Sequence, residues 1–199
     1  AFTMLLADGR RVVVRAEPTR DNDGDGVLDY DELGARNDGD GNMDGVPDSL
    51  QPHVAAVPSS VDPWQNVAFT THQNFTLTNV QTVPIPANPP GDLNTLGMFS
   101  LQISDLSPGE AATLEVTLPY AAVRRWWKYG PTPGNPTPHW YDFSFDGTTG
   151  AQIDGNRVTL HFVDGQRGDS DLTANGIIVD PGGPELFPET GFLPLVIGE

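Results

Sequence analysis

The sequence predicts an all-β protein: a β-sandwich, Ig-like or jelly-roll-like, preceded by an acidic segment with little regular secondary structure. Three observations support this prediction. The 199 residues include 22 glycines and 19 prolines, which interrupt helices and favour turns. Short runs of alternating apolar and polar residues, separated by turn residues, recur after Pro58. No segment shows convincing helical periodicity.

The first part of the chain, residues 1–16, is rich in strand-forming residues and contains Asp8-Gly9, a dipeptide that favours a hairpin turn. We expect a pair of short strands, and so small a pair is not stable by itself. It must therefore pack on its own sandwich, on an upstream domain or on the next copy of the chain. In the last case it is a donor strand, and repeated strand addition produces a filament. The apolar stretch 192–197, within a C-terminal strand or tail at 185–199, offers a second strand for the same assembly.

The second part, residues 17–53, carries the densest charge. Between Asp21 and Gln51 there are ten acidic residues and one basic residue, Arg36, a local charge of −9 within a chain of charge −17. Like charges at this density repel one another, so the segment should stay unfolded unless something neutralises it.

The spacing of these acids matches a calcium loop. Calcium prefers several oxygen ligands, and a twelve-residue loop supplies them from positions 1, 3, 5, 7, 9 and 12, with glycine at position 6 for the sharp turn. Gly26 falls at position 6 when the loop begins at Asp21. The candidate ligands are then Asp21, Asp23, Asp25, Val27 (through its carbonyl), Asp29 and Glu32.

A second loop follows in a register that begins at Asp40 and places Gly45 at position 6. Its candidate ligands are Asp40, Asn42, Asp44, Val46, Asp48 and Gln51. Gln51 offers one amide oxygen where a carboxylate offers two, so we expect the second site to be weaker. Asp31 and Asp38 are left over, either to cap a neighbouring ion or to face solvent.

An acidic linker is the simpler alternative, but a linker needs neither the alternation of acids nor the recurring glycine. Only residues 30–36 can form a short helix, so the helix pair of a calcium sensor is missing. Calcium at these two sites is therefore expected to be structural, with binding energy serving as folding energy. The paired "DNDGDGVLDYDE" and "DGNMDGVPDSLQ" resemble thrombospondin type 3 repeats, which implies a secreted or cell-surface protein, most often bacterial.

The third part, residues 54–184, is the expected sandwich. "TLEVTL" and "RVTLHFV" alternate with period two, as half-buried strands do. The predicted strands are 67–71, 75–80, 98–103, 112–118, 140–145 and 157–163. The stretch from "WWKYGPTPGNPTPHWYDF" to "DSDLTANGIIVDPGGP" resembles the bacterial choice-of-anchor U domain, which often follows calcium repeats ending in a motif like "DGVPDSLQ". That resemblance implies a surface or secreted β-domain without an assigned biochemical role.

Other functional classes find little support. The charge and a pI near 4.2 argue against nucleic acid and anionic membranes, and no apolar stretch is long enough for direct membrane insertion. The lack of cysteine excludes disulfides and thiolate zinc sites and is compatible with export. The four histidines show no metal-binding spacing, and no nucleophile motif occurs, so we do not expect an enzyme. The acids around Asp169 and Asp171, with Asp164 and Asn175, offer a third cation site or a solvated turn.

The sequence thus predicts an extracellular or cell-surface calcium-stabilised structural or adhesive protein, which associates with itself or with a neighbouring surface protein. The alternative is a carbohydrate-binding module that stacks glycan rings on its aromatic cluster. The simpler interpretation of that cluster is sandwich core. Its members are Trp126, Trp127, Tyr129, Trp140 and Tyr141.

Overall fold

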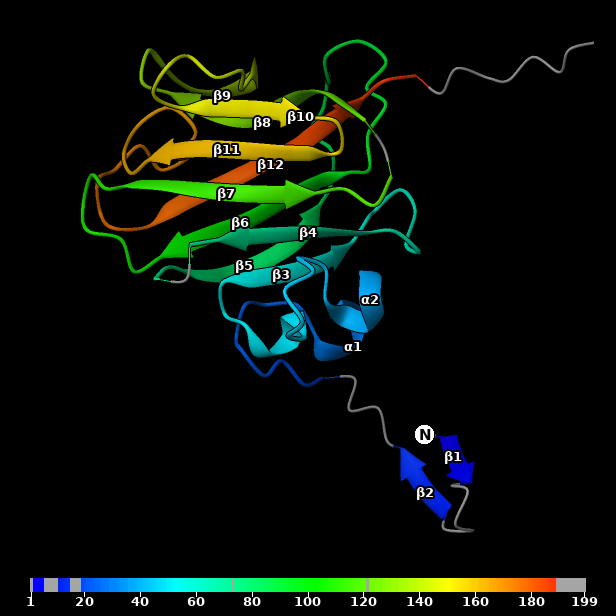
Figure 1. The fold of residues 1–199 in the computed structure, drawn as a ribbon. Helices are drawn as coiled ribbons and strands as arrows, with labels where there is room; N and C mark the ends of the chain where they lie inside the picture. The colour runs from blue at the N-terminus through cyan, green and yellow to red at the C-terminus, as the bar shows by residue number, and fades with distance from the viewer. Residues whose placement is uncertain (1, 6–10, 15–18, 73, 121, 189–199) are drawn as a thin grey trace, which may run out of the picture.

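The computed structural model of the chain describes residues 2–5, 11–14, 19–72, 74–120 and 122–188. Two five-stranded antiparallel sheets pack face to face as a sandwich, which confirms the predicted fold class (Figure 1). The first sheet has the order β10-β11-β7-β4-β3 and the second β5-β6-β12-β8-β9. Their strands are β3 (Val54–Pro58), β4 (Asn66–Thr71), β5 (Thr76–Val83), β6 (Met98–Ser104), β7 (Ala111–Thr117), β8 (Val123–Thr132), β9 (Asn135–Asp142), β10 (Gly150–Asp154), β11 (Arg157–Val163) and β12 (Ile178–Leu186).

Strands with a clear alternation lie where the sequence places them. In β7 and β11 burial alternates from one residue to the next, and the buried Leu114 stands opposite the buried Leu160 in the antiparallel register. The core between the sheets is rich in large side chains that are almost fully buried, among them Phe69, Phe99, Trp126 and Phe143. Burial of this apolar area is the main source of stability for such a sandwich.

Among the strands that lack the alternation, β3 and β12 do so for different reasons. β3 is buried along almost its whole length because the acidic segment covers the face that would otherwise meet solvent. β12, "IVDPGGPEL", is the central strand of its sheet although it contains Pro181 and Pro184. Proline is normally confined to edge strands, so sequence patterns do not reveal this one.

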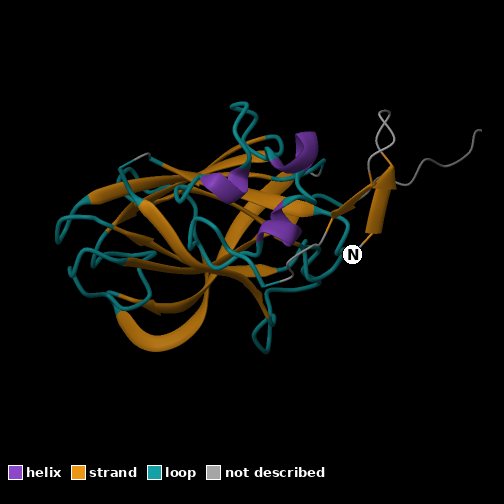
Figure 2. Cartoon of the chain, turned by 90° about the horizontal axis from the view of Figure 1, so that it is seen from below, coloured by secondary structure: helices purple, strands orange, loops and turns teal. Residues whose placement is uncertain are grey.

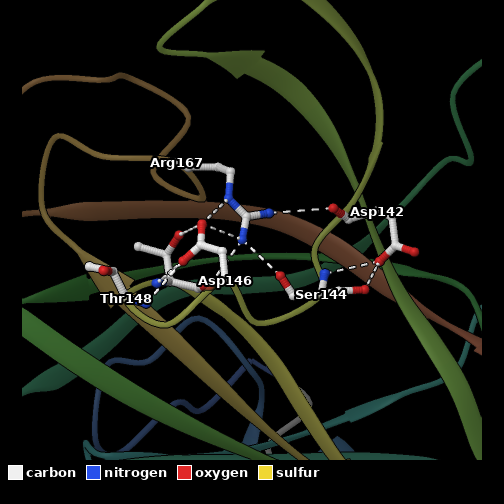
Figure 3. Close-up of polar contacts among 6 residues, drawn as sticks. Asp142, Ser144, Asp146, Thr148 and Arg167 are labelled. Carbon is white, nitrogen blue, oxygen red and sulfur yellow. Dashed lines mark hydrogen bonds and ion pairs between the residues drawn. The ribbon is translucent and has the colours of Figure 1, made fainter.

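The hairpin of β8 and β9 corrects one expected boundary. The strand expected at 140–145 runs instead over Asn135–Asp142, pairing with β8 through "NPTPHWYD". The chain then turns away, and Arg167 holds this turn, as Figure 3 shows. Its guanidinium donates to the carbonyls of Ser144 (2.8 Å) and Thr149 (2.9 Å) and pairs with Asp146 at 3.0 Å. Hydrogen bonds from the Thr149 and Thr148 amides, helped by Arg167, lower the pKa of Asp146 to about 2.

The acidic segment packs against the sandwich, beside β3 (Figure 1). It contains three single-turn helices, α1 (Asp29–Glu32), α2 (Arg36–Gly39) and the 3-10 helix η1 (Asp48–Leu50), which Figure 2 shows from below. The Val27 side chain belongs to the hydrophobic core cluster of the sandwich. The remaining loops carry little regular structure, as the sequence predicts.

The N-terminal segment forms the expected strand pair. β1 (Phe2–Leu5) and β2 (Arg11–Val14) are antiparallel, with Phe2 opposite Val14. The Asp8-Gly9 turn and the apolar stretch 192–197 lie outside the described residues. Within the described part of the chain, no helix has both the length and the apolar character needed to cross a membrane.

Candidate metal centre

Three carboxylates of the first loop converge on one point. Asp21, Asp23 and Asp25 each present an oxygen, and these oxygens lie within 4.8 Å of one another. Among the described residues this is the one group of three or more acidic, histidine or cysteine side chains that meets this spacing. Oxygen ligands at such separations suit a hard divalent cation.

Local backbone geometry brings these side chains together. Gly24 and Gly26 have positive φ angles of 80° and 101°, which turn the chain back on itself. Asp21 then accepts hydrogen bonds from the amides of both glycines, at 2.8 and 3.2 Å. The loop is thus closed by its first carboxylate, and any side chain at Gly26 would contact the backbone of Asn79 and Val80 at 3.1–3.2 Å.

Two acidic side chains of the first loop are buried with an oxygen that has no hydrogen-bond donor. Asp25 is 0% exposed; its Oδ1 accepts from the Val27 amide at 2.6 Å, while Oδ2 has no partner. Glu32 is 1% exposed; its Oε1 accepts from the Ala56 amide at 3.3 Å, while Oε2 has no partner. A buried carboxylate oxygen without a donor is costly, so each of these oxygens is a candidate cation ligand.

The remaining first-loop positions serve different roles. Asp29 is directed away from the group: its carboxylate accepts from the Asn22 amide at 2.9 Å and pairs with Arg20 at 3.3 Å. Val27, expected as a carbonyl ligand, has a buried side chain and donates its amide to Asp25. The structure therefore brings together Asp21, Asp23 and Asp25, with Glu32 buried beside them, but not Asp29.

The second loop repeats the first at an offset of 19 residues, the separation of Asp40 from Asp21. Asp40 accepts from the Gly45 amide at 2.9 Å, as Asp21 does from Gly26. Asp44 accepts from the Val46 amide at 2.9 Å, as Asp25 does from Val27. Asp48 accepts from the Gly41 amide at 2.9 Å, as Asp29 does from Asn22. Repetition of side-chain-to-backbone bonds, and not only of letters, supports the register that begins at Asp40.

The second loop is more open than the first. Asp44 is exposed, and its carboxylate accepts from the side-chain amides of Asn42 (3.2 Å) and Gln51 (3.2 Å). Gln51 also donates to the Val46 carbonyl at 3.0 Å, so its nitrogen points to two of the expected ligands. This arrangement fits the expectation that the second site is the weaker one. Met43 takes the fourth position with φ 64°, where the first loop has Gly24.

The first loop is attached both to the second loop and to the sandwich. The backbone N–H of Gln51 donates a hydrogen bond to Asp23 Oδ2 at 3.1 Å, across 28 residues of the sequence. The Asp25 carbonyl accepts from the Val80 amide of β5 at 2.9 Å, and Glu32 accepts from Ala56 of β3. The loop therefore links two strands, one from each sheet.

Burial shifts the acid–base behaviour of this cluster. Loss of hydration, together with the charges of Asp25 and Asp23, raises the pKa of Glu32 to about 9. The same loss of hydration raises the pKa of Asp25 to about 7 and those of Asp23 and Asp48 to about 6. Without a cation, the folded site holds protons at neutral pH; a divalent cation would replace them.

We therefore predict that the cation-free protein becomes less stable as the pH rises. Glu32 and Asp25 have folded-state pKa values of about 9 and 7 against ordinary values of 4.5 and 3.8, so the folded state binds more protons in that interval. Their contribution to stability is fully present below the ordinary values and is lost as the pH rises through the raised ones. In chelator, the melting temperature should be higher near pH 5.5 than near pH 8. Glu32→Gln should remove the larger part of this difference, and equal melting temperatures at both pH values would contradict the assignment.

Two other regions of interest have different environments. Asp164 accepts from the amides of Gly109 and Gly176, both at 2.8 Å, while Asp169 accepts from Gly165 (2.8 Å) and Val179 (3.0 Å). Asp171 accepts from the Thr173 amide at 2.8 Å. In the region expected as a third cation site, these carboxylates thus accept from the backbone of their own turn and its neighbours, while Asp164 Oδ1 is buried without a donor.

The aromatic cluster divides between the two faces of its sheet. Trp126 is 1% exposed and lies in the core. Trp127, Tyr129 and Trp140 are half-buried; the last two pack edge to face with their ring centres 5.4 Å apart. Trp127 and Trp140 donate their indole N–H groups to Glu185 (2.8 Å) and to the Ala87 carbonyl (3.1 Å).

No family model matches the chain, and no curated protein or solved structure is significantly similar to it.

Proposed function

We propose that this chain is a calcium-stabilised, non-enzymatic structural or adhesive protein of the cell surface or the extracellular space. The observation that carries the proposal is the pair of buried, donor-free carboxylate oxygens of Asp25 and Glu32 beside the converging Asp21 and Asp23. Such a group is unfavourable without a cation and favourable with one.

The donor set favours calcium over a transition metal. Every candidate ligand is an oxygen, from carboxylates, an amide or a backbone carbonyl, and hard oxygen donors suit calcium or magnesium. Magnesium demands a near-ideal octahedron and keeps several waters, while calcium accepts the larger, irregular shell of a flexible loop. Asp21, Asp23, Asp25 and Glu32, with the Val27 carbonyl, would hold the first ion. Asp40, Asn42, Asp44 and the Val46 carbonyl, with Gln51, would hold the second, and Asp48, which accepts from the Gly41 amide as Asp29 does from Asn22, would lie outside the shell.

The role follows from where the loops are attached. Because the first loop bonds to β3 and β5, an ion that orders the loop also holds the acidic segment against the sandwich. Calcium would then stiffen the junction that follows the N-terminal segment. This supports a load-bearing or spacing role better than a signalling one.

Surface association has two supports. Within the described residues the strand pair β1–β2 is a separate two-stranded sheet, and strand addition by another copy at its outer edges would extend it. Trp64 is 90% exposed beside Tyr30 and Leu33, an apolar patch of the kind that marks contact with a partner. Size-exclusion chromatography with and without calcium tests self-association; a single monomer peak under both conditions contradicts it.

A carbohydrate-binding module is the second candidate, favoured by the half-buried Trp127, Tyr129 and Trp140 of strands β8 and β9. With Trp126 in the core, the platform is smaller than the sequence suggests. Screening on a glycan array decides this candidate: no bound glycan removes it.

Calorimetric titration with calcium tests the proposed ion site directly. We expect two binding events, the tighter one at the first loop, where Asp25 and Glu32 supply buried charged ligands. Asp25→Asn should abolish the tighter event and leave the weaker one, since the amide keeps the shape but loses the charge. Asp44→Asn is the matched control in the second loop and should affect only the weaker event. Absence of heat with the unaltered chain would contradict the proposed function.

A further inference from the structure

The chain contains one lysine, Lys128, and that lysine is completely buried. Lysine is among the residues least often found in protein interiors, because its charged end is strongly hydrated. It lies in the middle of β8, on the face of the sheet that meets the core. Neither the proposed calcium sites nor the outward aromatic side chains involve it.

Its amine is surrounded by a small set of groups. Nζ lies 2.5 Å from Oδ1 of Asp180, whose side chain is 3% exposed. Nζ also donates a hydrogen bond to the Gly168 carbonyl. It stands 4.7 Å from the ring centres of both Phe143 and Phe162, which close the space from the side of the opposite sheet and the turn after β9.

Strand register places the amine on this carboxyl. Lys128 stands directly opposite Gly182 of β12, so Asp180, two residues away, is its diagonal neighbour on the same face. Because Gly182 has no side chain, it leaves space for the Lys128 amine to approach the Asp180 carboxyl group. A Cβ at this position would lie 2.5 Å from Trp126 Nε1 and 3.2 Å from Asp180 Oδ1.

The surroundings favour the uncharged forms of both groups. Burial lowers the pKa of Lys128, although Asp180 opposes this shift, and burial raises the pKa of Asp180, although Lys128 opposes it. An amine that has lost its proton is a nucleophile, and the carbon of a protonated carboxyl group is an electrophile that such an amine can attack.

We propose that Lys128 and Asp180 condense into an intramolecular amide bond that covalently joins β8 to β12. One proton first passes from the ammonium to the carboxylate, which leaves a neutral amine and a carboxylic acid. The Nζ lone pair attacks Cγ of Asp180 and forms the C–N bond; the C–OH bond breaks, and the departing hydroxyl takes a proton from the nitrogen. One water molecule leaves, and no oxidant, reductant or cofactor is needed. Fixed proximity and exclusion of water favour a condensation that is unfavourable in bulk solvent.

Mass spectrometry of the unfolded protein distinguishes this bond from a permanent ion pair. With the amide bond, the intact mass is lower than the sequence mass by one water molecule. Trypsin then cannot release the peptide 126–128, and the digest contains 126–157 joined to the peptide that begins at Gly168. The full sequence mass together with free 126–128 overturns the proposal.

Amine labelling gives an independent readout. In denaturant, a reagent for primary amines should modify only the α-amino group of the unaltered chain, because the single lysine is consumed. The exposed Arg157→Lys is the matched control: it should keep the loss of water and gain one label. Lys128→Arg should show its full sequence mass. If that variant fails to fold, the unaltered protein still decides the question. Its full sequence mass, or labelling of Lys128 after unfolding, excludes the bond.

Discussion

Removal of calcium should lower the melting temperature of this protein by about 10 °C. A ligand that binds only the folded state stabilises it by RT ln(1 + [L]/Kd), which is about 4 kcal/mol at a thousandfold excess over Kd. For a chain of this length, each kcal/mol shifts the melting temperature by roughly 2–4 °C. Calorimetry in calcium and in chelator measures the difference.

Two variants distinguish the contribution of the first loop to calcium-dependent stability from that of the second loop. Asp25→Asn should lose most of the calcium-dependent increase, because Asp25 is a buried candidate ligand whose second oxygen has no protein donor. Asp44→Asn should lose little of it, because Asp44 is exposed and already bonded to Asn42 and Gln51. Magnesium at the same concentration should protect less than calcium. A melting temperature that is the same in calcium and in chelator would show that the acidic loops are not a stabilising ion site.

Replacement of the buried lysine should be the most damaging single change in the sandwich. Lys128→Met keeps the volume but leaves Asp180 buried without its partner, a loss of about 3–5 kcal/mol in the free energy of unfolding. Loss of the proposed amide bond adds to this effect. Denaturant unfolding followed by tryptophan fluorescence measures the change.

The double variant Lys128→Met with Asp180→Leu is the control for the charge. Replacing both members of a buried pair by apolar side chains is often nearly neutral, so this variant should recover the part of the loss that comes from the unpaired carboxylate. The part that is not recovered reports the covalent bond. A single variant as stable as the unaltered chain would show that the pair contributes neither charge compensation nor a bond.

The first acidic loop was predictable because its signal is local. The carboxylates at alternate positions and Gly26 lie within six residues, and the φ of 101° at that glycine is what the spacing requires. The second loop was predictable for the same reason, and its register is supported by the bond from the Gly45 amide to Asp40. That Asp29 turns to Arg20 and Asn22 depends on side-chain competition that the spacing does not encode.

Five strands of the sandwich, β4, β5, β6, β7 and β11, were predicted to within a few residues, because short alternating runs between turn residues mark them, whereas β8 and β10 were not predicted. β3 was missed because the acidic segment covers its outer face, and β12 because prolines and glycines occupy a central strand. Both depend on contacts between segments far apart in the chain. The burial of Glu32 is of the same kind, since its bond to Ala56 spans 24 residues.

By itself, the sequence determined that this is a β-sandwich with two acidic glycine-turned loops, because turn residues, alternation and ligand spacing act over a few residues at a time. Only the tertiary structure decided which carboxylates lose their water, that the loops lie against the sandwich, and that the single lysine meets Asp180. Those outcomes depend on burial and strand register, which are properties of the packed sheets and of no short stretch of chain.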